Sequence, residues 1–336
     1  MMKKSAWKHI VLAGALSLSG ASGALAAVTA RLGHAMPDTH PQAVAMNRFV
    51  ELAAKYTNNN VQIKVYHSAQ LGSDEKQLQA VQSGTQEFYI GSVAAFSTRI
   101  KEVQIWDMPF LFANNQEVYA LQDGPTAQKI FKQMEPAGVI GLGWGNIGFR
   151  NISNSKRPIT KVEDLSGLKI RVTPNPLAID IWKTLGTNAT PMAFSEVFTA
   201  LEIKAIDGQE NPLMHMYANK MQEVQKFISL SNHAYVTVGL VASKKFWDGL
   251  PDADKAGIQK AADEAKALQR QLLEQADKDV IAKFIEAGVK VNAIADEELL
   301  KFRERVKPVV ERFSAQIGES FVKEFQAEIE KVRSGS

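Results

Sequence analysis

Residues 167–202 read GLKIRVTPNPLAIDIWKTLGTNATPMAFSEVFTALE and show the local order of an α/β protein. The apolar residues of 168–172 predict a short strand, and those of 177–185 recur at helical spacing. A second short strand is expected at Thr190 and a second helix over 195–201. Strands that alternate with helices in this way predict a sheet covered by helices.

The same alternation continues toward the N-terminus. We expect strands at 28–33, 61–65, 87–92, 139–144 and 148–152, and helices at 41–56, 74–82 and 116–134. The segment 61–65, VQIKV, alternates apolar and polar residues as a half-buried strand does. This order predicts a largely parallel sheet with helices on both faces.

Toward the C-terminus, strands are expected at 227–230, 234–242 and 289–294, and helices at 252–285 and 296–333. The segment 252–285 is rich in strong helix formers and contains no proline and one glycine, Gly257. Pro308 is the candidate point of interruption in the last helix. The chain exceeds the usual size of a single core, so two domains are expected. Without a visible flexible linker, we expect strands that cross between them.

The first residues have the pattern of a cleaved export signal. Lys3, Lys4 and Lys8 precede an apolar stretch at 10–18, and Ala24-Leu-Ala26 matches the motif that a signal peptidase recognises. We therefore expect a signal peptide over 1–26, cleaved after Ala26 or Ala27, and a periplasmic location. A buried N-terminal helix is the disfavoured alternative, because the segment has no polar face. No later segment reaches the roughly 18 apolar residues of a membrane span, so no direct membrane insertion is expected.

The charge balance also limits the partners. The sequence has 39 basic and 36 acidic residues, and removal of 1–26 would take away three lysines and no acid, which leaves 36 of each. A neutral mature chain predicts no nucleic-acid partner. The absence of cysteine fits an oxidising compartment and excludes disulfides, thiolate metal ligands and thiol catalysis.

Two patterns typical of other functions are weak. Residues 143–148, GWGNIG, match GxGxxG, but a dinucleotide site needs a helix to begin inside the motif, whereas 149–152 continues as a strand. His34, Asp38 and His40 have the chemistry of metal ligands, yet they straddle Pro37 without a further close ligand. No nucleophile elbow or phosphate-binding loop is present. We expect no metal, no cofactor and no enzymatic activity, with a periplasmic enzyme as the rival interpretation.

An ordered set of short motifs is more informative. The motifs are QLG at 70–72, DMPFLF at 107–112, GFR at 148–150, DLSGLKIR at 164–171, MAFSEV at 192–197, DGQENP at 207–212 and KKFW at 244–247. Each is weak alone, but together they resemble the solute-binding proteins of tripartite ATP-independent periplasmic (TRAP) transporters, the DctP family. The resemblance extends over nearly the whole chain after residue 26.

The resemblance implies a periplasmic binding protein fold, with two α/β lobes, a ligand cleft between them and a long helix spanning both. Lobe I should comprise 28–148 plus 237–276, and lobe II 149–236 plus 277–336. It also implies capture of a small organic acid, hinge closure and delivery to the membrane permease subunits. A sensor-docking binding protein of the same fold remains an alternative.

The resemblance also assigns residues. The carboxylate-binding arginine of the family falls on Arg171, its second cleft arginine on Arg150, and its cleft asparagine on Asn211. Phe194 stands where members place an aromatic ring over the ligand, although it also suits the start of a helix. A guanidinium offers two parallel donors to a carboxylate, which lysine cannot reproduce.

Two further candidates rest on local pattern. Asn175 lies between two prolines, which either preorganises its amide for ligand hydroxyls or starts a helix. His34 ends the first strand, where loops of such folds face the cleft. A C4-dicarboxylate would need a further basic group for its second carboxylate, and Arg99 is the only visible candidate. An aromatic ring with amide donors suits a ring or polyhydroxylated monocarboxylate better. We therefore expect a sugar acid such as a uronate, with C4-dicarboxylates second and aromatic or α-keto acids third.

Overall fold

The computed structural model describes residues 27–97 and 99–335, so the predicted signal peptide lies outside the described residues. The strands are β1 (Val28–Gly33), β2 (Val61–Tyr66), β3 (Phe88–Ser92), β4 (Val139–Asn154), β5 (Lys169–Val172), β6 (Asn188–Pro191), β7 (Gly208–Pro212), β8 (Phe227–Leu230), β9 (Tyr235–Ser243) and β10 (Lys290–Ala293). The helices are α1 (Pro41–Tyr56), α2 (Asp74–Ser83), α3 (Asn115–Asp123), α4 (Pro125–Met134), α5 (Pro176–Thr184), α6 (Phe194–Glu202), α7 (Leu213–Ala218), α8 (Lys244–Asp248), α9 (Asp252–Asp277), α10 (Val280–Glu286), α11 (Asp296–Ile317) and α12 (Glu319–Ser334).

The sheet is mixed rather than largely parallel. Its strand order is β2-β1-β3-β9-β4-β7-β5-β6, and β8 pairs with both β4 and β10. β1 lies parallel to β2 and β3, and β5 lies parallel to β6 and β7. β9 runs antiparallel to both of its neighbours, β3 and β4. The prediction of a largely parallel sheet is therefore wrong, because β9 returns from late in the chain and inserts between β3 and β4.

β4 joins the two halves of the sheet. The part before Arg150 pairs with β9, and the part from Arg150 onward pairs with β7 and β8. The GxGxxG residues 143–148 lie inside this strand, and no helix begins within them. A bulge precedes Gly148, whose φ of 118° is a conformation that favours glycine. The motif therefore lets a long strand bend as it crosses the molecule.

α9 spans two hydrophobic cores. Ile258 and Ala265 belong to the core that contains α1 and β1, and Leu273 belongs to the core formed with α6, α7 and α10. Gln269 fixes the helix to β4, because its Nε2 donates to the Asn146 carbonyl at 3.0 Å and its Oε1 accepts from the Asn146 N–H at 3.3 Å. The predicted α/β class with a long helix across both halves is confirmed.

Glycine breaks two of the predicted helices. The predicted helix 116–134 consists of α3 and α4, which meet at Gly124, and Pro125 starts α4 in a position that suits its fixed φ. The last helix continues through Pro308 and breaks at Gly318, where φ is 118°. A glycine with positive φ thus ends α11, rather than the proline inside it.

The predicted helix 252–285 is also two helices. α9 ends at Asp277, and α10 begins at Val280. No glycine or proline separates them, so the sequence has no local signal for the break. α10 packs against α7, where the rings of Phe284 and Tyr217 lie 5.4 Å apart. The contact of α10 with α7 is the tertiary packing found at this break.

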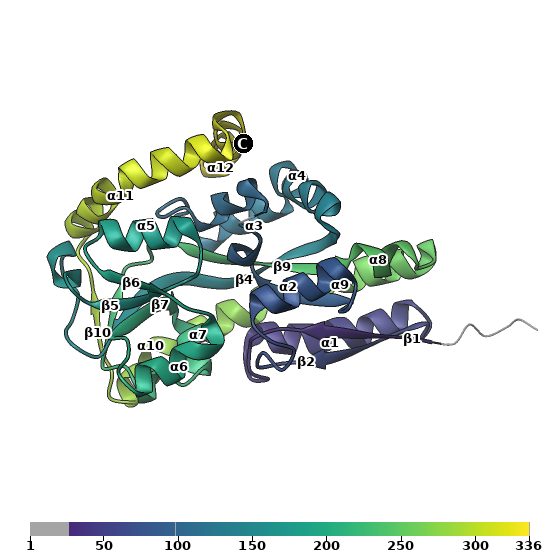
Figure 1. Cartoon of the computed structure of the whole chain (residues 1–336), viewed down its shortest axis with the longest axis horizontal. Coiled ribbons are helices and arrows are strands. Elements are labelled where there is room, and N and C mark those ends of the chain that lie inside the picture. Colours follow the sequence, from purple (N-terminus) through teal and green to yellow (C-terminus); the bar gives the residue numbers. More distant parts are fainter. Residues whose placement is uncertain (1–26, 98, 336) are drawn as a thin grey trace, which may run out of the picture.

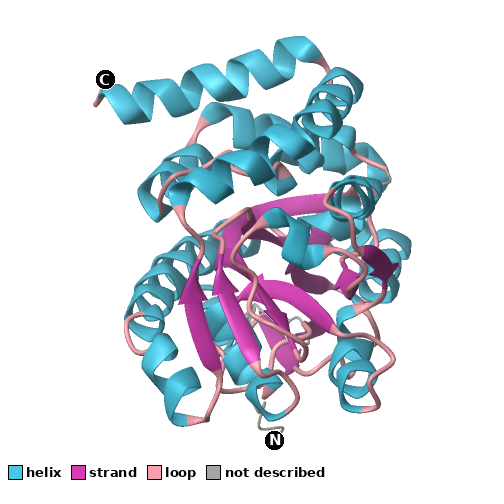
Figure 2. Cartoon of the chain, turned by 90° about the vertical axis from the view of Figure 1, so that its left-hand side faces the viewer, coloured by secondary structure: helices cyan, strands magenta, loops and turns pink. Residues whose placement is uncertain are grey.

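The helices form layers around the sheet. In Figure 1, α11 and α12 run along the upper side of the molecule, where α11 packs on α5 and α12 packs on α3. α1, β1 and β2 lie on the lower side. Figure 2 shows helices on both sides of the strands. None of the helices within the described ranges is long and apolar enough to cross a membrane.

Candidate functional site

Two adjoining cavities lie inside the molecule where elements of both halves of the sheet meet. Their volumes are about 50 and 40 Å³, and both are lined by Ser92, Arg150 and Thr173. The first, here the arginine cavity, is also lined by Ala35, Met36, Gln42, Asp74, Ile90, Gly91, Ile147, Arg171, Phe194, Asn211, His215, Val236 and Val238. The second, here the tryptophan cavity, is also lined by Asp107, Pro109, Asn175, Ala178, Ile181, Trp182, Glu210, His233 and Ala234. Because they share a wall, the two cavities form one candidate site.

Arg171 presents one edge of its guanidinium to the arginine cavity. It lies on β5 and is buried, and its Nε and Nη2 donate to the Met192 carbonyl at 2.9 and 2.7 Å. The Phe194 ring centroid lies 5.9 Å from Cζ. These donors occupy one edge, so the edge that carries Nη1 makes no hydrogen bond to any described residue. That edge matches the two oxygens of a carboxylate.

Burial and the charge of Arg150 lower the pKa of Arg171 to about 10. Arg171 is therefore still a cation at neutral pH. The charges of Glu210, Asp74 and Glu75 oppose the shift, but none of these carboxylates forms a salt bridge with Arg171. A buried cation without a direct ion pair attracts an anionic ligand strongly, because the surrounding dielectric is low.

Arg150 is neutralised within the protein. Its Nε and Nη2 contact the two carboxylate oxygens of Glu210, with Nη2 at 2.7 Å from Oε1. His233 Nε2 lies 3.1 Å from Oε2 of the same carboxylate. Burial alone would raise the pKa of Glu210, but the Arg150 charge and these hydrogen bonds lower it to about 2. Glu210 is therefore ionised and balances the charge of Arg150.

Asn211 and Phe194 complete one wall of the arginine cavity. Asn211 follows Glu210 on β7, and its Nδ2 donates to Gln209 Oε1. Phe194 starts α6, and its ring lies 4.2 Å from the ring of His215. Four of the six predicted residues, Arg150, Arg171, Asn211 and Phe194, thus line one cavity.

Asn175 lines the tryptophan cavity instead. Its Oδ1 accepts from the Ala178 N–H at 2.7 Å and so caps α5, and its Nδ2 lies 3.3 Å from Asp107 Oδ2. Both ends of the amide are thus already bonded to the protein. This geometry favours the alternative interpretation of Asn175 as a residue that starts a helix.

His34 and Arg99 do not line the two cavities as the structure describes them. The His34 Nδ1 accepts from the Met36 N–H at 3.2 Å, and burial lowers the pKa of this residue to about 4, so its imidazole is neutral. Arg99 is exposed and donates to Gln82. The second carboxylate of a dicarboxylate ligand bound in these cavities would therefore not contact the Arg99 guanidinium.

The sequence analysis did not identify the acidic residues in the walls of the two cavities. Asp74 starts α2, and Asp107 ends the 3₁₀ helix Lys101–Asp107. Burial raises the pKa of Asp74 to about 6 and that of Asp107 to about 7, although nearby arginine charges oppose both shifts. Asp107 and Glu210 stand inside the quoted motifs DMPFLF and DGQENP, which could have indicated them. Asp74 has no such signal.

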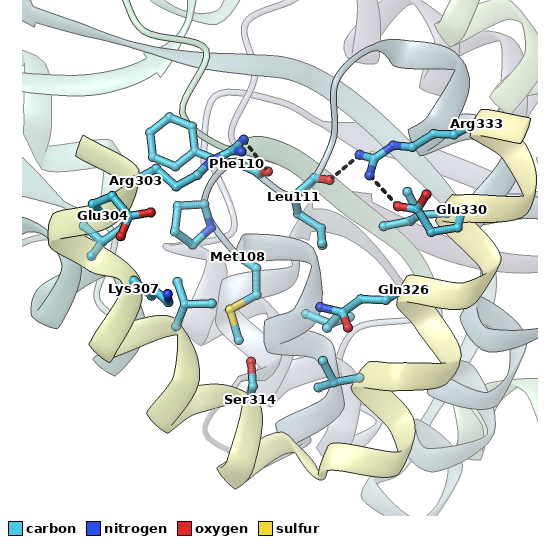
Figure 3. Close-up of a pocket in the computed structure, with 16 residues that line it drawn as sticks. Met108, Phe110, Leu111, Arg303, Glu304, Lys307, Ser314, Gln326, Glu330 and Arg333 are labelled. Atoms are coloured by element: carbon cyan, nitrogen blue, oxygen red, sulfur yellow. Dashed lines mark hydrogen bonds and ion pairs between the residues drawn. The ribbon is translucent and has the colours of Figure 1, made fainter. Parts of the chain in front are cut away.

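A larger groove of about 770 Å³ lies on the outer side, between α11, α12 and residues 108–111 (Figure 3). Arg303 Nη2 donates to the Phe110 carbonyl at 3.3 Å, and Arg333 Nη2 donates to the Leu111 carbonyl at 3.1 Å. Arg333 also bonds to Glu330. Because these guanidinium groups already bind the protein and none of the six predicted residues lines the groove, the interior cavities are the better candidate.

The histidines form no metal centre in the part of the chain that the structure describes. No group of three or more His, Asp or Glu side chains there is arranged to hold a metal ion. Asp38 Oδ2 lies 3.3 Å from Nε2 of His67. His40 caps α1 through a hydrogen bond from the Gln42 N–H. These contacts account for two of the three side chains that were weighed as ligands.

Comparison with known proteins identifies the family. The galactonate complex of the sugar acid binding protein DctPAm from Advenella mimigardefordensis superposes with a TM-score of 0.89 at 37% identity, over 91% of this chain and 98% of that one. The 2,3-diketo-L-gulonate-binding periplasmic protein YiaO of Escherichia coli is 32% identical over 87% of this chain and 88% of its own. The C4-dicarboxylate-binding periplasmic protein DctP of Rhodobacter capsulatus is 31% identical over 92% and 93%. The profile of the DctP family, bacterial extracellular solute-binding protein family 7, matches residues 32–316. The chain therefore belongs to the DctP family of TRAP transporter solute-binding proteins.

Proposed function

We propose that the chain captures a sugar acid, a monocarboxylate with several hydroxyl groups, in the arginine cavity and its neighbour. It does so in the periplasm after removal of the signal peptide, and it delivers the ligand to the membrane permease subunits of a TRAP transporter. The protein performs no chemistry on the ligand. Arg171 binds the carboxylate, with Arg150, Asn211 and Phe194 around it.

The charge balance of the walls carries this proposal. Of the described lysines and arginines, Arg150 and Arg171 line the two cavities, and Glu210 neutralises Arg150. Asp74 and Asp107 also face the cavities. When ionised they repel a second ligand carboxylate, and when protonated they donate to a hydroxyl. The site therefore suits one carboxylate with hydroxyl groups better than two carboxylates.

The relatives give independent support and name the alternative. DctPAm is a sugar acid binding protein, and YiaO binds 2,3-diketo-L-gulonate, a polyoxygenated monocarboxylate. The similarity to a C4-dicarboxylate-binding protein makes such dicarboxylates the second candidate class. A role in docking to a membrane sensor has the same ligand chemistry. Permease genes beside the gene of this protein would favour transport.

We further propose that closure of two lobes traps the ligand. Lobe I comprises 28–148 plus 237–276, and lobe II comprises 149–236 plus 277–336. These boundaries fall near the bend of β4 at Gly148, the first residues of β9 and the end of α9 at Asp277. Each crossing is thus a short backbone segment, and such segments can absorb the rotation of a hinge.

A thermal-shift panel tests the ligand class. Uronates, aldonates, succinate, malate and arylglyoxylates are each added to the purified protein. A ligand at about 100 times its dissociation constant stabilises the folded state by about 2.7 kcal/mol, a melting shift of several degrees. We expect shifts with sugar acids. A shift with succinate or malate alone would contradict the proposal. Mass spectrometry of any co-purified acid is a second test.

A further inference from the structure

Gln42 and His215 are buried polar side chains that face the arginine cavity without protein partners. Gln42 is 1% exposed, and neither its Nε2 nor its Oε1 has a hydrogen-bond partner. His215 is 4% exposed, and its Nδ1 has none. Both residues line the cavity that contains Arg171. Buried polar atoms without partners are rare and destabilising, so their presence here requires an explanation.

The helices that carry the two side chains meet through the rings of His40 and His215. Gln42 lies in the first turn of α1, behind Pro41, and its N–H donates to His40 Nδ1 at 3.1 Å. The His40 ring meets the His215 ring edge-on at 5.7 Å. His215 comes from α7 and packs against Phe194 on its other side. The two polar groups are thus supplied by opposite halves of the fold, from α1 and from α7.

The chemistry of the pair matches hydroxyl groups. Burial, together with the positive charges nearby, keeps the pKa of His215 well below its usual value, so its imidazole is neutral. A neutral imidazole and a carboxamide each offer both a donor and an acceptor. A hydroxyl also donates and accepts, so it can satisfy either group. A carboxylate only accepts hydrogen bonds. In the same place it would put its acceptor atoms against the Gln42 oxygen and the unprotonated nitrogen of His215, which are acceptors too, and these would stay unpaired.

We propose that Gln42 and His215 are specificity-determining residues that bind the hydroxyl groups of the ligand chain, while Arg171 binds its carboxylate. This inference rests on the proposed sugar-acid function and adds to it the two groups that recognise hydroxyls. Ligand binding then satisfies polar atoms that the protein itself leaves without partners. A site built to bind hydroxyls rejects analogues that lack them, because the same atoms would stay unpaired.

The test replaces each group by an apolar side chain of similar shape. Gln42→Met and His215→Phe are compared with wild type, and Gln79→Met on the exposed side of α2 is the matched control. Calorimetry with D-galactonate measures the dissociation constant, and thermal denaturation without ligand measures stability. We expect about 10- to 100-fold weaker galactonate binding by Gln42→Met and His215→Phe, because each leaves ligand hydroxyls unpaired. The control should bind as wild type does.

The stability measurement separates this role from a structural one. Because the Gln42 amide has no protein partner, Gln42→Met should unfold without ligand at the wild-type temperature or above it. Galactonate binding by both variants within about threefold of wild type would overturn the inference and leave the sugar-acid function standing. Weaker binding that accompanies a marked loss of unliganded stability would also overturn it. A wild-type protein that binds neither galactonate nor any other sugar acid of the panel would refute the proposed function and this inference together.

Discussion

Replacement of Arg171 is the most direct test of how the ligand is held. One edge of its guanidinium binds the Met192 carbonyl through Nε and Nη2, which leaves the Nη1 edge for a ligand carboxylate. Arg171→Ala removes one partner of a desolvated ion pair, which costs about 3–5 kcal/mol or about 10²–10³·⁵ in affinity. Arg171→Lys keeps the charge, but a single ammonium cannot bind the carbonyl and both carboxylate oxygens in the same geometry.

For Arg171→Lys we expect the loss of about one charge-assisted hydrogen bond, 1.5–3 kcal/mol, or roughly 10- to 150-fold in the dissociation constant. Titration calorimetry with D-galactonate measures the effect, and the exposed Arg48→Lys on α1 is the matched control. A dissociation constant of Arg171→Lys within about threefold of wild type would refute the role in which one guanidinium edge binds the Met192 carbonyl and the other binds the ligand carboxylate. An equal loss in the Arg48 variant would point to a general effect of charge or folding.

Two other predictions concern closure and pH. If the lobes close on the ligand, saturating galactonate should reduce the radius of gyration of the wild-type protein in small-angle scattering. The Arg171→Ala variant should stay open at the same galactonate concentration. An unchanged radius of gyration for wild type would contradict hinge closure. Because burial raises the pKa of Asp74 to about 6, its carboxylate ionises as pH rises through that value and repels the ligand anion. Affinity should therefore fall between about pH 5 and 8, and Asp74→Asn should flatten the part of the profile near pH 6 but not the part near pH 7, where Asp107 titrates. A wild-type affinity that is constant over this range would contradict the role of Asp74.

Local sequence pattern was sufficient for most of the secondary structure. The predicted strand 28–33 and helix 41–56 coincide with β1 and α1, because alternation and helical spacing are properties of neighbouring residues. The break after Asp277 and the antiparallel insertion of β9 had no such signal. Both depend on contacts with distant segments, α7 in the first case and β3 in the second.

The candidate site, too, could be predicted from the sequence only in part. The sequence by itself determined the α/β class and the export signal pattern, and through the family motifs it led to the proposal that Arg150 and Arg171 bind the ligand. Those motifs are short and continuous, so they can be recognised without a structure. Only the tertiary structure decided that Glu210 neutralises Arg150 and that Gln42, Asp74 and His215 face the same cavity as Arg171. These side chains come from α1, α2, α7 and three strands. Their pairing and desolvation set the charge of the site, and both arise only when those elements pack together.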